Sequence, residues 1–134
     1  MRLIRYEVTS PSGNTMGMLS ALSFFTGSQF KDEQKACNKI AALTKPFNEK
    51  LFAPKLNLFH EYRFFFTNRG ARQFRRQLKA VANQAKTDGW KPVKRIINIK
   101  DALLPETVYR DEYQIAISLS RYNQTPKVET TTAI

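Results

Sequence analysis

The chain has 134 residues, enough for one domain whose core needs no covalent staples. Its single cysteine, Cys37, excludes an intrachain disulfide framework and a cysteine-based zinc cluster. The net charge of +11 at pH 7, without an apolar run long enough for a signal peptide or a membrane helix, indicates a cytoplasmic protein with an anionic partner.

The N-terminal part of the chain predicts two strands. Side chains alternate along residues 2–9, where Ile4, Tyr6 and Val8 share the side expected to be apolar. A loop rich in Ser, Pro and Gly follows. Residues 19–26 then favour a return strand, although the spacing of their apolar side chains also fits a short helix.

Apolar side chains at helical spacing predict a helix over residues 32–52, with Ser28 as a candidate cap. The stripe consists of Ala36, Ile40, Leu43, Phe47 and Leu51. Pro46 lacks a backbone donor and is expected to kink or split the helix. Cys37 lies beside the stripe and is expected to be a small buried residue. The charges on the opposite face nearly balance, as on a solvated surface.

The next segment predicts strand, helix and strand over residues 58–66, 71–86 and 93–99, with the two strands parallel and joined by a right-handed crossover. Eleven of the 22 Lys and Arg residues lie between positions 63 and 100, accompanied by one acid, Asp88. The positive charge of the chain is therefore concentrated in this segment.

The remaining chain predicts an acidic excursion over residues 101–112, a strand over 113–119 and a flexible polar tail over 123–134. Residues 1–122 are expected to form a single compact α+β domain. Its two helices pack on one face of a mostly antiparallel four- or five-stranded sheet, in the order ββαβαββ.

The predicted helix 71–86 separates apolar from basic side chains. Its apolar stripe consists of Phe74, Leu78, Val81, Ala82 and Ala85. The rest of its surface carries only positive charge, from Arg69, Arg72, Arg75, Arg76, Lys79 and Lys86. Repulsion between like charges one helical turn apart accumulates to about 1 kcal/mol, which an anionic partner would relieve. Phosphate fits, because guanidinium groups bind it bidentately.

A second candidate surface is the sheet face without helices. Alternation in the strands places Arg63, Phe65 and Lys94 on that face, where aromatic rings between cations would hold single-stranded nucleic acid by stacking. The alternative is that the loop 101–112 or a second subunit buries these aromatic rings. The sequence lacks the basic-Gly-aromatic pattern of an RNA-recognition strand.

These features predict a small, non-catalytic accessory protein that binds DNA or RNA, with no cofactor and no membrane partner. The predicted contact residues are Arg63, Phe65, Arg69, Arg72, Arg75, Arg76, Lys79, Lys86 and Lys94. Binding through six or more phosphates would weaken on the order of 10³-fold between 50 and 200 mM salt. The alternative is an inhibitor or adaptor of the phage or mobile-element type, whose basic face docks on an acidic patch of a larger protein.

One further alternative is enzymatic. His60, the aromatic strand that ends at Thr67, and the run Asp111, Glu112 and Tyr113 resemble the scattered His, aromatic and Glu residues of ADP-ribosyltransferase-like folds. This resemblance rests on isolated residues and would imply an ADP-ribosyltransferase-like activity. From its strand parity, His60 itself is expected to be a hydrogen-bonded core residue.

Overall fold

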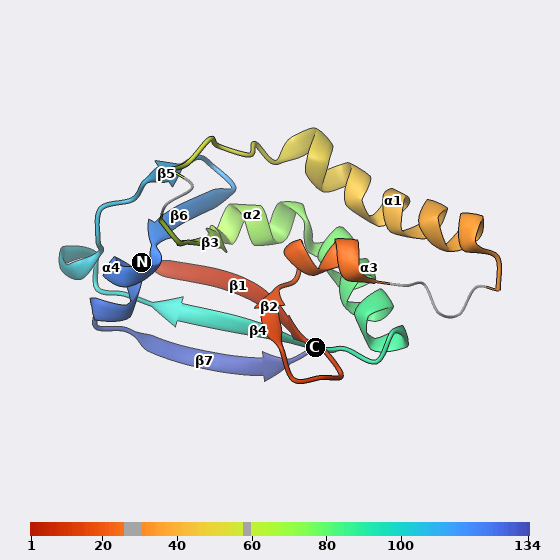
Figure 1. Cartoon of the computed structure of the whole chain (residues 1–134). Helices are drawn as coiled ribbons and strands as arrows, with labels where there is room; N and C mark the ends of the chain where they lie inside the picture. Colours follow the sequence, from red (N-terminus) through yellow and green to blue (C-terminus); the bar gives the residue numbers. More distant parts are fainter. Residues whose placement is uncertain (26–30, 58–59) are drawn as a thin grey trace. The chain divides into compact units, whose positions relative to one another are not determined.

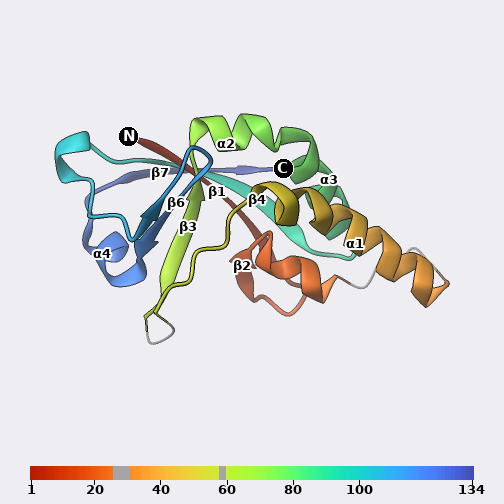
Figure 2. The same cartoon turned by 90° about the horizontal axis from the view of Figure 1, so that it is seen from above.

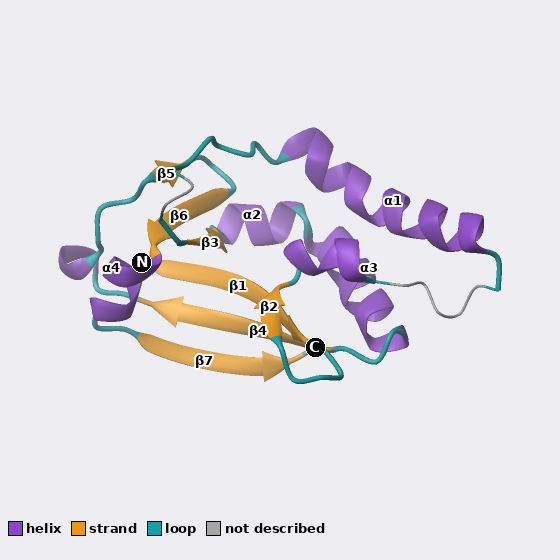
Figure 3. Cartoon of the chain, in the orientation of Figure 1, coloured by secondary structure: helices purple, strands orange, loops and turns teal. Residues whose placement is uncertain are grey.

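The computed structural model describes residues 1–25, 31–57 and 60–134, and Figures 1 and 3 show their secondary structure. In chain order the elements are β1 (Arg2–Thr9), β2 (Thr15–Gly17), the 3-10 helix η1 (Ser20–Phe24), α1 (Glu33–Lys50), β3 (Tyr62–Phe66), α2 (Asn68–Gln73), α3 (Arg75–Thr87), β4 (Lys91–Asn98), the 3-10 helix η2 (Asp101–Leu103), β5 (Tyr109–Arg110), β6 (Gln114–Ser118), α4 (Leu119–Gln124) and β7 (Val128–Ala133). The candidate cap Ser28 and the first two residues of the predicted strand 58–66 lie outside the described residues.

The strands form one antiparallel sheet in the order β5-β6-β3-β1-β4-β7, and β2 pairs with β1 outside this row. The α+β class is as predicted, but the sheet has seven strands instead of four or five. β3 and β4 both run antiparallel to β1, so they are parallel to each other, with β1 between them. The unpredicted strands are β2 and β5, which have only three and two residues, and β7, which lacks apolar alternation.

Close contacts divide the chain into two units, each built from three separate segments. Unit 1 comprises residues 1–5, 52–73 and 95–131. Unit 2 comprises residues 6–51, 74–94 and 132–134. Residues 123–134, predicted to be a flexible polar tail, contain the end of α4 and strand β7.

The core of unit 1 forms where alternating side chains of its strands meet α4. It consists of Leu3, Phe65, Ile97, Ile99, Ile115, Ile117 and Tyr122. Figures 1 and 2 show α4 beside β6, and the Tyr122 ring of α4 lies 5.2 Å from the Phe65 ring. Leu3 and Ile4 are both buried. Because adjacent strand residues point to opposite faces, both faces of the sheet are covered here, one of them by α4.

Helices α1 and α3 contact each other in unit 2. The Phe47 and Phe74 rings stack with centroids 5.4 Å apart. All five residues of the predicted apolar stripe of α3 are buried, as are Ala36, Leu43 and Phe47 of α1. Trp90, at the junction between α3 and β4, packs its ring edge-on against Phe25 at 5.4 Å. Burial of such apolar surface is the main stabilising contribution to helices of this length.

The local structure of unit 2 differs from the sequence predictions at several positions. Residues 20–24 form η1 and not the favoured strand. Asp32 caps α1 through a hydrogen bond from the Gln34 amide at 2.8 Å. The helix is not split at Pro46 and continues to Lys50. Cys37 is exposed, because it follows the buried Ala36 by about 100° around the helix.

His60 is also exposed, contrary to the prediction of a core histidine. It precedes the first residue of β3, Tyr62, so strand parity does not determine where its side chain lies. Within the described part of the chain, no helix is both long and apolar enough to cross a membrane.

Candidate nucleic-acid interface

Helix α3 presents a row of cations on its solvent side. Arg75, Lys79 and Lys86 are exposed and lie within about 40° of one another around the helix, while Arg76 lies about 100° from Arg75. The row is about 16 Å long at 1.5 Å per residue. The buried stripe occupies the other side and packs against α1, so its burial fixes which way these cations point.

The helix has no charge that offsets this row. It contains no Asp or Glu, and Asp88 follows only at its C-cap. Across the residues that the structure describes, Arg75, Arg76, Lys79 and Lys86 form no ion pair. Helix α1 provides a contrast, since its Lys45 and Glu49 lie 3.7 Å apart one turn from each other. The basic face of α3 is therefore electrostatically unrelieved within the described chain.

The first turn of α3 adds to the unrelieved positive charge of the helix. Phe74, at the N-cap position, provides no side-chain hydrogen bond to the helix, and Arg75 and Arg76 occupy the first two helical positions. The N-terminus of a helix carries partial positive charge and exposed N–H donors, so cations there are unfavourable and anions favourable. The side chains of Arg75 and Arg76 would therefore stabilise an anion at the start of α3.

Lys94 and Tyr6 are neighbours in unit 2. The Lys94 ammonium lies 6.0 Å from the centroid of the Tyr6 ring, at the outer limit of a cation–π contact. Burial raises the pKa of the Tyr6 phenol, and the charge of Arg75 opposes that increase. Tyr6 was not predicted to be a neighbour of the basic residues, although it shares strand parity with Ile4 and Val8 in β1.

The remaining predicted contact residues belong to unit 1, and one of them is buried. Phe65 is only 2% exposed, so the prediction that it faces outward and stacks on a base is wrong; the unpredicted helix α4 covers that face. The Arg63 guanidinium lies 5.8 Å from the Tyr122 ring centroid. Arg72 is exposed on α2. Arg69 forms an ion pair with Glu112 at 3.0 Å.

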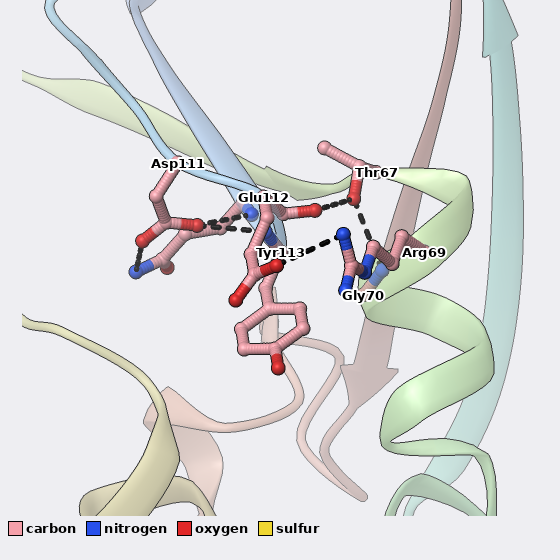
Figure 4. A network of polar contacts seen from close by, with 7 residues as sticks. Thr67, Arg69, Gly70, Asp111, Glu112 and Tyr113 are labelled. Atoms are coloured by element: carbon pink, nitrogen blue, oxygen red, sulfur yellow. Dashed lines mark hydrogen bonds and ion pairs between the residues drawn. The ribbon is translucent and has the colours of Figure 1, made fainter.

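Arg69 belongs to a polar network that joins α2 to the loop before β6, shown in Figure 4. The Thr67 hydroxyl accepts from the Gly70 amide at 3.0 Å and donates to the Glu112 carbonyl at 2.6 Å. The Thr67 amide donates to the Tyr113 carbonyl at 3.0 Å. These bonds cap α2 and fix the loop, so the contacts of Arg69 and Glu112 serve the local structure of unit 1.

Asp111 organises the same loop. Its carboxylate accepts hydrogen bonds from the Tyr113 and Gln114 amides at 2.8 and 2.9 Å, and from the Tyr109 phenol at 2.6 Å. Burial alone would raise the pKa of Asp111, but these hydrogen bonds outweigh burial and lower it. The hydrogen bond to Asp111 raises the pKa of Tyr109 to about 12.

Five of the nine predicted contact residues belong to unit 2, namely Arg75, Arg76, Lys79, Lys86 and Lys94. The other four belong to unit 1, where one is buried and another is ion-paired. Comparisons of the chain with protein-family profiles, with curated proteins and with solved structures found no match. The function is therefore argued from the chemistry of this surface.

Proposed function

We propose that the protein binds nucleic acid by contacting backbone phosphates through the exposed face of α3. The observation that carries the proposal is the row formed by Arg75, Arg76, Lys79 and Lys86, which has no acid on the helix and no ion pair in the described chain. The row extends over about 16 Å, roughly the rise of five nucleotides of one strand at about 3.4 Å each. It is therefore long enough to meet about four phosphates.

Phosphate chemistry suits the N-terminal end of this row. Guanidinium groups such as those of Arg75 and Arg76 form charge-assisted, bidentate hydrogen bonds with phosphate oxygens. The N-terminal dipole of α3 favours an anion at the same end. Each neutralised phosphate also releases condensed counterions, which is the main source of affinity for a backbone reader.

The burial of Phe65 changes the proposed ligand. The sequence had suggested base stacking on the sheet, but that ring lies in the core of unit 1. Without this platform, the contacts left to α3 are with phosphates, which both strands of a duplex present continuously. We therefore propose a double-stranded ligand held by its backbone and without base stacking on Phe65.

The test is fluorescence anisotropy of labelled duplex and single-stranded oligonucleotides of equal length. Wild-type protein is compared with Arg75→Gln/Arg76→Gln, and with the control Lys35→Gln/Lys39→Gln, which removes the same charge from the exposed side of α1 in the same unit. The proposal predicts that the wild type and the control bind duplex with similar affinity and that the α3 variant loses roughly 10²-fold.

Equal losses in the α3 variant and the control would contradict the proposal, because they would show that only total charge matters. Weak binding of every oligonucleotide, removed by heparin and insensitive to the α3 variant, would also contradict it. That second outcome would favour the alternative in which the basic face docks on an acidic patch of a larger protein.

A further inference from the structure

Strand β7 ends the row of strands with an open edge. It has six residues, all exposed, and among the described residues no strand pairs with its outer side. The other end of the row is β5, which has only two residues. Natural sheets protect their edges with short strands, charges, prolines or bulges, because an open edge recruits another strand. By this criterion β5 is protected and β7 is not.

Successive residues of β7 direct their backbone N–H and C=O groups alternately to β4 and to the open side. The Ile134 amide donates to the Pro92 carbonyl of β4 at 3.2 Å. In an antiparallel pair, residues that bond to the neighbour alternate with residues whose N–H and C=O point away from it. The amides and carbonyls of Glu129, Thr131 and Ala133 are therefore directed to the open side.

The side chains of β7 favour pairing more than they prevent it. Three consecutive Thr residues, 130–132, have β-branched side chains that suit strands. The one charged residue is Glu129, which already contacts Arg95 at 4.0 Å and accepts a hydrogen bond from the Tyr122 phenol. The charge of Glu129 is therefore partly neutralised by Arg95 and Tyr122, so it would repel a partner strand only weakly.

We propose that a second copy of this chain pairs with β7, antiparallel and about a two-fold axis at Thr131. In this register Glu129 faces Ala133 of the other copy, and Val128, 67% exposed, faces Ile134. Thr130 faces Thr132, a favourable cross-strand pair. An axis at Glu129 would instead place two carboxylates against each other. The register at Thr131 is thus self-complementary, as a two-fold interface requires.

The pairing predicts a concentration-dependent dimer, measured by sedimentation velocity without nucleic acid. Thr131→Pro removes an outward N–H, whereas the matched Thr131→Val keeps it; both lose the hydrogen bond that Arg95 donates to the Thr131 hydroxyl. The wild type and Thr131→Val are expected to dimerise, and Thr131→Pro is expected to stay monomeric with an unchanged circular dichroism spectrum.

A second pair of variants leaves the backbone intact. In the proposed register, Thr130→Lys/Thr132→Lys places lysines opposite lysines and should weaken the dimer roughly tenfold, whereas Thr130→Lys/Thr132→Glu places lysine opposite glutamate and should strengthen it. A wild type that is monomeric at every soluble concentration would overturn the proposal. Equal dimerisation of the two double variants would overturn it as well.

Discussion

Gly70 lies where α2 meets the loop before β6, at a position with no room for a side chain. An ideal Cβ built there would lie 2.0 Å from the Tyr113 carbonyl oxygen, which is backbone and cannot rotate away. In an ordinary helix Gly→Ala is stabilising, because glycine loses more conformational freedom on folding. At this position we expect Gly70→Ala to destabilise the protein by about 3 kcal/mol, measured by urea unfolding.

The matched control is Gln73→Ala, an exposed position in the same helix. It should leave the free energy of unfolding nearly unchanged, within about 0.5 kcal/mol. If the Gly70→Ala variant were as stable as the wild type, the Tyr113 carbonyl would not lie close enough to residue 70 in solution to clash with a Cβ.

The hydrogen bond between Tyr109 and Asp111 predicts a pH dependence of stability. The pKa of Asp111 is lowered on folding, so its contribution is present above its ordinary value, about 4, and is lost as the pH falls through the lowered pKa. The pKa of Tyr109 is raised to about 12. Its contribution is present below the ordinary value, about 10, and is lost as the pH rises toward the raised pKa.

Tyr109→Phe isolates this contribution. The difference in unfolding free energy between wild type and variant should be largest between about pH 4 and pH 10 and should shrink outside that range. Urea unfolding at several pH values measures it. Tyr62→Phe, which removes another phenol from unit 1 and leaves the Tyr109–Asp111 hydrogen bond in place, is the control. A difference for Tyr109→Phe that is independent of pH would rule out the coupling.

At the scale of elements, α3 has a basic first turn that opposes its own dipole. Replacing both Arg75 and Arg76 with Glu should place negative charge at the positive end of the helix, and the new carboxylate at the first of these positions should pair with Lys79 one turn later. We expect the double variant to gain about 1 kcal/mol and to unfold about 4 °C higher by circular dichroism. The same variant should lose nucleic-acid binding.

Lys86→Glu is the control for this prediction, because Lys86 lies in the last turn of α3, where a cation is favourable. Both changes reverse the sign of exposed charges on one helix, but Lys86→Glu should lower the unfolding temperature. If both variants lowered it alike, the arginines would be stabilising the fold, and their place in a binding surface would lose its main support.

The sequence predicts the elements whose apolar side chains repeat over several turns or residues. β1, the buried stripes of α1 and α3, and β6 were found in this way, because burial imposes its period on the sequence. α4 and β7 were missed, since α4 has six residues and every side chain of β7 is exposed. Because α4 was not predicted, Phe65 was assigned to an open face of the sheet. The contact between the Phe65 and Tyr122 rings shows that α4 covers this face.

At the scale of the whole molecule, the sequence showed which segment carries the positive charge. It did not show that the basic residues are divided between the two units. The nine predicted contact residues were drawn from two candidate surfaces, the helix 71–86 and the open sheet face, and five of them belong to unit 2 and four to unit 1. Charge is visible in a sequence, whereas the partners that neutralise it are not. Glu112, which pairs with Arg69, lies more than forty positions away along the chain. The number of phosphates expected to be bound therefore falls from six or more to about four.

The most direct measurement is the salt dependence of duplex binding. Four neutralised phosphates predict a slope of log affinity against log salt near about −3.6, or a loss of roughly 10²-fold between 50 and 200 mM. Arg75→Gln/Arg76→Gln should reduce the magnitude of this slope by about 2, and Lys35→Gln/Lys39→Gln should leave it unchanged. A wild-type slope near zero, or a slope that the α3 variant does not alter, would contradict phosphate binding by this helix.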